Sequence, residues 1–247
     1  MEAKVVFQSK KGLKMPRHTI PVELYIEASQ VFHWATMRHF SIWFTGSSRR
    51  HRRTETVLRR LSKRGILRTF KYGKKLVYSS KPVQDELDGL AKVSHGLACT
   101  ECLVRFFRSR TDGMIVAEKY FYGLGCVPEW GIVYPEGKML LFEFSTRNDF
   151  LVTGKVKGKL EAYLKNLERI EEKFNAKAVL VYVIDIPKVT LERFLHKQWH
   201  AGSVAALSPE IFFADYKTFL SIPIGEQLTA SIYYWMDGKQ YALRRNV

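Results

Sequence analysis

Apolar positions recur at intervals of three and four residues through the first third of the chain. Leu24, Ala28 and Val31 follow this spacing and predict a helix that begins near residue 20. A second helix is predicted over residues 36–44, where aromatic side chains share one side and Gly46 can end the helix. The first third of the chain is therefore expected to open with two short helices.

The next segment combines a narrow apolar stripe with an otherwise basic surface. Val57, Leu58 and Leu61 form the stripe, and Gly65 can end this third helix in a left-handed conformation. Two short strands are then expected on either side of a turn at Gly73: Ile66–Tyr72 and Lys74–Ser79.

Beyond residue 93 the pattern alternates between helical and extended segments. A helix is expected over 94–108, an extended segment at Met114–Tyr120, and a strand pair within Gly125–Ser145 that turns at Pro135–Gly137. A long amphipathic helix follows, in which apolar residues from Val156 to Phe174 step by four and three. The last expected elements are a strand at Ala178–Ile184, a helix over 190–199, a strand at Glu210–Ala214, a helical turn at Tyr216–Leu220 and a hairpin of Ser231–Met236 with Lys239–Arg244.

This order of elements predicts an α/β arrangement in a chain that is α+β overall, with a mixed sheet flanked by helices. Composition shifts near residue 83, where acidic residues become frequent. The expected parts are a basic N-terminal arm at 1–19, a first domain at 20–82, a linker at 83–93 and a second domain at 94–247.

Charge is distributed very unevenly along the chain. The net charge is +16, of which residues 1–82 carry +15 and the other 165 residues carry +1. Such asymmetry is typical of a polyanion-binding module joined to a neutral domain. No lipidation signal, amphipathic anchor or membrane-spanning run is recognisable, so double-stranded DNA is the expected partner and an intracellular location is expected.

Residues 20–82 resemble a winged helix-turn-helix domain in the order helix, helix, basic helix, hairpin. The phrase Leu61-Ser-Lys-Arg-Gly-Ile-Leu67 is similar to the junction between recognition helix and wing in that family. The resemblance implies that the third helix enters the major groove and that the wing contacts phosphates. The DNA-binding residues it implies are Arg49, Arg50, Arg52, Arg53, Thr54, Thr56, Arg59, Arg60, Lys63, Lys71, Lys74 and Lys75. A winged domain that contacts only protein is the alternative.

Two carboxylates lie in apolar surroundings within Gly125–Ser145. Glu129 follows Pro128, and Glu143 lies within Leu-Leu-Phe-Glu-Phe. Burying a glutamate is costly unless it meets a metal ion, a cation or a proton, so the pair predicts a site. Alternatively, Glu129 lies in an exposed loop and Glu143 at a sheet edge, where neither needs a partner.

The segment from about residue 94 to 220 resembles the PD-(D/E)xK nuclease fold. Pro128-Glu129, then Glu143-Phe144-Ser145, then the helix beginning near Gly154 carry the resemblance. With a winged helix domain in front, the chain is most similar to the replication-relaxation group of plasmid and mobile-element proteins.

The nuclease resemblance implies that Glu129 and Glu143 bind Mg²⁺ or Mn²⁺, with Glu101 as a further acid. Glu129 replaces the usual Asp, and Ser145 stands where a Lys, or the Asp of the replication-relaxation pattern, would be. Lys155 or Lys159 of the next helix could supply the missing cation. A nuclease fold that has lost its activity, with the acids paired to local cations, is the alternative.

Three cysteines are too few for a disulfide framework. Cys99 and Cys102 form a Cys-x-x-Cys, His95 precedes them and Cys126 follows. The four residues could together bind a metal ion, or the cysteines could be small apolar residues of a buried core.

Three functions remain open from the sequence. The first is a DNA-binding protein of a plasmid, virus or other mobile element, acting in replication, mobilisation or transcription control. Such a protein could form a homodimer or dock on replication or mobilisation proteins. The second is a divalent-metal-dependent DNA endonuclease, and the third is a winged-helix module that binds protein alone.

Overall fold

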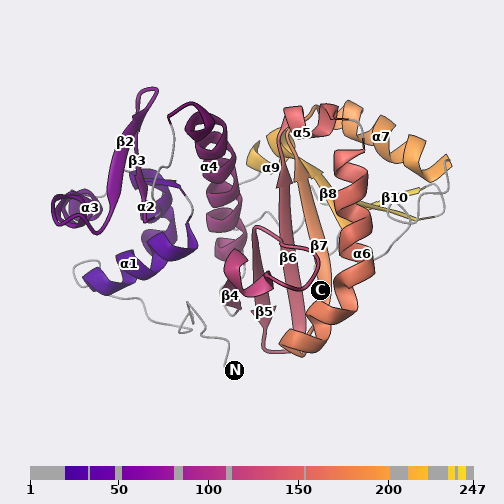
Figure 1. Cartoon of the computed structure of the whole chain (residues 1–247), viewed down its shortest axis with the longest axis horizontal. Helices are drawn as coiled ribbons and strands as arrows, with labels where there is room; N and C mark the ends of the chain where they lie inside the picture. Colours follow the sequence, from indigo (N-terminus) through magenta and orange to yellow (C-terminus); the bar gives the residue numbers. More distant parts are fainter. Residues whose placement is uncertain are drawn as a thin grey trace. The chain divides into compact units, whose positions relative to one another are not determined.

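The computed structural model of the chain describes residues 20–32, 34–47, 52–80, 86–109, 113–152, 154–200, 211–221, 233–236 and 239–242. These residues form helices, a three-stranded sheet and a seven-stranded sheet (Figure 1), so the expected α+β class is confirmed. The chain divides into two compact units between Thr111 and Asp112. No helix in the described ranges combines the length and the apolar character needed to cross a membrane.

The N-terminal unit opens with two helices joined by a very short strand. They are α1 (Val22–Val31), β1 (Ala35–Thr36) and α2 (Met37–Thr45). The backbone N–H of Thr36 donates to His39 Nδ1 at the start of α2, and Gly46 ends that helix in the left-handed region at φ 70°. Phe40 and Phe32 pack edge to face between the two helices.

The third helix, α3 (Arg52–Lys63), is followed by the hairpin of β2 (Arg68–Tyr72) and β3 (Lys75–Ser79). Gly65 adopts φ 71°, and the N–H of Ile66 donates to the Leu61 carbonyl, which closes the end of α3 as the sequence predicted. The strand order is β1-β3-β2, with antiparallel neighbours.

The long helix α4 (Glu86–Ser109) changes the expected division of the chain. It covers most of the segment predicted as a linker at 83–93, and it belongs to the N-terminal unit instead of the second domain. Val93 is buried in one cluster with Trp34 and Val77. Gly96 passes the Trp34 indole so closely that a Cβ would lie 2.1 Å from Cδ1. The acidic composition near residue 85 suggested a linker, because the sequence does not reveal that the following residues of α4 pack against Trp34.

The second unit is built on one mixed sheet. Its strands are β4 (Met114–Ala117), β5 (Trp130–Tyr134), β6 (Lys138–Ser145), β7 (Lys177–Ile184), β8 (Ile211–Asp215), β9 (Tyr233–Met236) and β10 (Lys239–Ala242). They lie in the order β10-β9-β8-β7-β6-β5-β4 (Figure 1). Only the pairs β6–β7 and β7–β8 are parallel. The expected extended segment at 114–120 ends early, because a 3₁₀ helix, η1 (Glu118–Phe121), follows β4.

The parallel strands are connected by helices, as βαβ crossovers require. The short α5 (Arg147–Leu151) and the long α6 (Lys155–Phe174) join β6 to β7, α7 (Lys188–His200) leaves β7, and α9 (Tyr216–Ser221) follows β8. Apolar residues of α6 and α7 share one buried cluster with Leu141, Tyr182 and Phe213 of the sheet. Phe144 points to the opposite face, where its ring meets Tyr216 of α9 edge to face. The C-terminal hairpin forms as expected, but its turn at 237–238 is outside the described residues.

Candidate functional site

One side of α3 is a continuous row of exposed polar residues. Arg52, Thr56, Arg59 and Lys63 are spaced by four, three and four, and all four are exposed. Arg60 lies exposed beside this row. Thr54, Val57, Leu58 and Leu61 form the opposite, buried side, so the apolar stripe predicted from the sequence is the face that packs inward.

The expected place of Thr54 at the DNA is wrong. Thr54 is 0% exposed, and its hydroxyl lies 3.3 Å from the Tyr25 hydroxyl of α1. It precedes Val57 and Leu58 by three and four residues, which puts it on their face of the helix. Arg49 and Arg50 lie outside the described residues.

The row on α3 contains one anchored arginine. Glu55, whose side chain is 16% exposed, accepts from Arg59 Nη2 at 2.8 Å across one helical turn. The Arg59 side chain is 68% exposed, so its guanidinium keeps open faces for an anion. On the hairpin, Lys71, Lys74 and Lys75 are exposed.

The second candidate site centres on Glu143, which lies near the carboxyl end of β6 and is 2% exposed. Lys159 of α6 donates to Glu143 Oε1 at 2.5 Å, and the Tyr163 hydroxyl donates to Oε2 at 2.7 Å. Of the two lysines proposed to reach back from the helix, the structure brings Lys159 to the carboxylate. Lys155 is paired with Asp149.

The Glu143 carboxyl ionises near neutral pH. Burial and the charge of Glu129 raise its pKa to about 7, although Lys159 and Tyr163 act in the opposite direction. Burial lowers the pKa of Lys159, but the charge and hydrogen bond of Glu143 outweigh it and raise that pKa above its ordinary value. The Lys159 ammonium group therefore stays charged at neutral pH, beside a Glu143 carboxyl whose charge changes around pH 7.

Glu129 enters this site from the loop in front of β5. Its backbone N–H donates to the Phe142 carbonyl at 2.9 Å, and Trp130 stacks on the Phe142 ring at 4.3 Å. Glu129 is partly buried, and its charge acts on the pKa of both Glu143 and Lys159. Neither acid is an ordinary surface residue, since Glu143 is buried and Glu129 is electrostatically linked to it.

Ser145 lies two residues beyond Glu143 on the same face of β6. Its hydroxyl is 2.7 Å from the Tyr182 hydroxyl of β7. Asp149 accepts from the Thr146 backbone N–H and hydroxyl at the start of α5, and its charge also acts on the pKa of Lys159.

The donor set fits a hard divalent cation such as Mg²⁺ or Mn²⁺. Two carboxylates are a common number of protein ligands for Mg²⁺, which keeps several of its waters. Each oxygen of Glu143 accepts one hydrogen bond and has a further lone pair. Glu129 and Glu143 would hold the ion.

Glu101 does not take the place expected of it. It is 6% exposed on α4 within the N-terminal unit, where it accepts from Arg38 at 2.5 Å, His39 at 3.0 Å and Arg105 at 2.6 Å. Since His39 Nδ1 accepts from the Thr36 N–H, the ring proton is at Nε2 and donates to Glu101. The prediction that Glu101 is a third acid beside Glu129 and Glu143 is therefore replaced by a role in the packing of α2 on α4.

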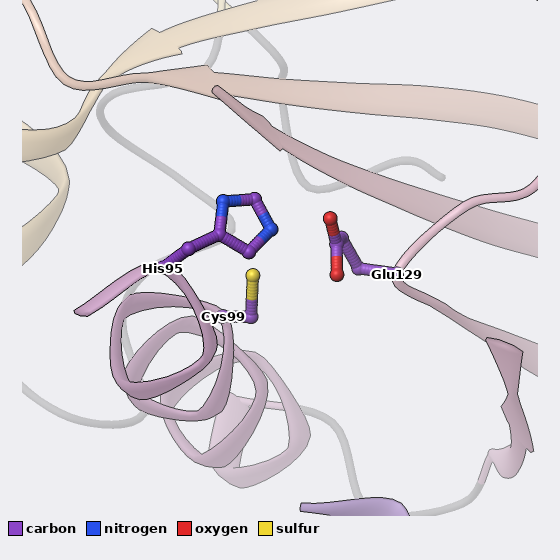
Figure 2. Close-up of side chains that lie close together, drawn as sticks. All are labelled: His95, Cys99 and Glu129. Carbon is purple, nitrogen blue, oxygen red and sulfur yellow. The ribbon is translucent and has the colours of Figure 1, made fainter. Parts of the chain in front are cut away.

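Cys99, Cys102 and Cys126 are buried and form no disulfide in the described part of the chain. Figure 2 shows His95 and Cys99 on α4; Glu129, also labelled, belongs to the other unit. A ring nitrogen of His95 and the sulfur of Cys99 lie within 4.8 Å of each other. Burial raises the pKa of Cys102 well above its ordinary value and that of Cys126 to about 11. Of the four residues that the sequence left open as metal ligands, His95 and Cys99 are grouped within this distance among the described residues, whereas Cys102 and Cys126 are not.

Sequence reasoning missed three side chains of the Glu143 site: Tyr163, Tyr182 and Asp149. Tyr163 and Tyr182 were counted as apolar positions of their helix and strand, which they also are. The spacing Thr146-x-x-Asp149, a helix-capping pattern, was a signal that could have located Asp149 at the start of a short helix.

Comparisons with known proteins leave both resemblances as hypotheses. No protein-family model matches the chain, and a search of curated proteins gives no match.

Proposed function

We propose that this protein binds double-stranded DNA through α3 and the hairpin β2–β3. The observation that carries the proposal is the row Arg52, Thr56, Arg59 and Lys63, exposed along one side of α3. Cations spaced along an exposed helix match the phosphates that flank a DNA groove. The described part of α3 has a single acid, Glu55, and its charge is offset by Arg59.

The topology of the N-terminal unit supports a winged-helix interpretation. Three helices are followed by a hairpin, and β1 pairs with β3, which therefore lies in the middle of the sheet in the order β1-β3-β2. In such a domain the N-terminal half of the third helix meets base edges, and the wing meets phosphates. The resemblance to replication-relaxation proteins suggests action on a plasmid, virus or other mobile element in replication, mobilisation or transcription control.

A salt titration tests DNA binding. Affinity for a duplex should fall by about a thousandfold or more between roughly 50 and 200 mM salt, because each phosphate contact releases counterions. Arg52→Ala with Arg60→Ala should weaken binding at least tenfold and flatten the salt dependence. Lys165→Ala, an exposed cation on α6, is the matched control and should leave affinity unchanged. Absence of binding to any duplex would instead favour a protein-binding module.

A second function, divalent-metal-dependent DNA cleavage, is favoured by one contact. Lys159 reaches Glu143 at 2.5 Å and so provides a cation that Ser145 cannot. A bound Mg²⁺ or Mn²⁺ would polarise the scissile phosphate and lower the pKa of a bound water. Lys159 would stabilise negative charge developing on that phosphate, and Tyr163 would fix the orientation of Glu143.

Nicking of supercoiled plasmid with Mg²⁺ or Mn²⁺ tests this second function. We expect Lys159→Met to reduce nicking at least a hundredfold, since a cation aimed at developing charge is lost. Lys157→Met is the control, because Lys157 is exposed and its side chain lies near Glu161 on the outside of α6. Equal loss in both variants, or no nicking by the wild-type protein, would contradict the proposal.

A further inference from the structure

The segment in front of Glu129 contacts α6 at several points. Lys173 donates to the Tyr120 carbonyl at 2.5 Å, and Arg169 Nη2 donates to the Gly123 carbonyl at 3.2 Å. Side chains of α6 thus contact the backbone of this loop at two points before Cys126. Hydrogen bonds to backbone carbonyls fix the path of a loop independently of its side chains.

Gly125 makes the closest approach to the helix. It adopts φ +89°, and a Cβ on it would lie 2.3 Å from Asn166 Oδ1. Asn166 cannot easily move away, because it is 9% exposed, its Nδ2 donates to the Ala162 carbonyl at 2.8 Å, and its Oδ1 accepts from Arg169 Nη1 at 3.4 Å. Only glycine satisfies both the backbone conformation and the space at this position.

The same side of α6 also carries the partners of Glu143. Lys159 and Tyr163 hold that carboxylate, and Asn166, Arg169 and Lys173 follow at the next turns of the helix. One rigid helix therefore supports both halves of the acidic site. The N-terminal half meets Glu143, and the C-terminal half meets the loop that leads to Glu129.

We propose that this side of α6 sets the separation between the Glu129 and Glu143 carboxylates, with Asn166 and Arg169 as positioning residues for Glu129. The ligand is a hard divalent cation bound between the two acids, so the inference rests on the proposed metal site. Neither Asn166 nor Arg169 touches the ion. They act by fixing the loop, as residues behind metal ligands commonly do.

Mn²⁺ binding to the full chain, followed by electron paramagnetic resonance, tests the proposal without relying on cleavage. Arg169→Met should weaken Mn²⁺ about tenfold, the range found when residues behind metal ligands are removed. Lys165→Met, on an exposed turn of α6, is the control and should bind like the wild type. Thermal unfolding of each variant shows that the fold is retained.

A double-mutant cycle separates positioning from general destabilisation. Gly125→Ala alone should weaken Mn²⁺ about tenfold, whereas in an Asn166→Ala background the same change should cost less, because the clash is gone and only the backbone strain at φ +89° remains. If Gly125→Ala does not fold, the Mn²⁺ affinity of Arg169→Met still tests the proposal. Equal Mn²⁺ affinity in the wild type and Arg169→Met, or additive effects in the cycle, would overturn this inference alone. A wild-type protein that binds no Mn²⁺ would overturn both the metal site and the inference.

Discussion

Glu101 and Glu143 are both buried, yet their pKa values lie on opposite sides of that of an exposed glutamate. Burial acts to raise both. At Glu101 the hydrogen bond from His39, together with Arg105 and Arg38, outweighs burial and holds the pKa well below its ordinary value. At Glu143, burial and the nearby charge of Glu129 raise the pKa. Lys159 and Tyr163 act to lower it but do not outweigh them. The count and sign of the neighbours thus decide the charge state of each residue.

Glu101→Gln should destabilise the protein by about 3 kcal/mol at pH 7, because it leaves the buried Arg105 guanidinium without its carboxylate. A folded-state pKa below the unfolded value means that Glu101 contributes stability above about pH 4.5, which is lost as pH falls toward the folded pKa. The difference between variant and wild type in urea unfolding should therefore shrink below pH 4.5. A loss under about 1 kcal/mol at pH 7 would contradict this role.

Glu143→Gln should show the reverse pH dependence. The folded pKa of about 7 lies above the unfolded value, so the ionised carboxyl costs stability that increases from about pH 4.5 to 7. Between pH 5 and pH 8 the wild type should lose about 2–3 kcal/mol relative to Glu143→Gln. Urea unfolding at the two pH values measures this, and a difference that does not vary with pH would refute it.

At the scale of elements, α3 separates two tasks on its two faces. Thr54 faces α1, and Arg52, two positions earlier, faces outward. The buried side of α3 therefore holds the unit together, and the outer side is left for the proposed contact with DNA.

We expect Thr54→Ala to lower the free energy of unfolding by about 1 kcal/mol and to leave the duplex affinity of the folded protein unchanged. Arg52→Ala should weaken duplex binding about tenfold with unfolding unchanged within about 0.5 kcal/mol. Fluorescence anisotropy and urea unfolding together measure both effects. If instead Thr54→Ala weakened duplex binding and Arg52→Ala lowered the free energy of unfolding, α3 would present a different face to DNA.

At the scale of the whole molecule, the excess positive charge and the acidic site belong to different parts of the chain. Residues 1–82 carry nearly all of the net charge, and Glu129 and Glu143 lie in the unit that begins at Asp112. The proposed binding and the proposed cleavage of DNA should therefore be separable by mutation.

Glu143→Gln should abolish nicking of supercoiled DNA while keeping the duplex affinity of the wild type. Arg52→Ala with Arg60→Ala should lower nicking at limiting protein and restore much of it at saturating protein. Anisotropy and plasmid nicking on the same preparations check both outcomes. Loss of duplex binding in Glu143→Gln would place the carboxylate site in DNA recognition instead.

Much of the fold could be predicted from the sequence, because apolar spacing is local. The stripe of α3, the glycine that ends it, and the α6–β7 succession were all expected close to where they lie. The start of α4 was not, because Val93 and Trp34 meet across 59 positions of sequence and no local pattern records that contact.

The sequence by itself determined the charge asymmetry, the periodic elements and the presence of two glutamates in apolar surroundings. Only the tertiary structure decided which cations the buried acids Glu143 and Glu101 meet. Glu143 meets Lys159 from a helix beyond it in the chain, and Glu101 meets Arg38 from a helix 63 positions before it. Ion pairs form wherever packing brings opposite charges together, and packing depends on contacts between residues far apart in sequence.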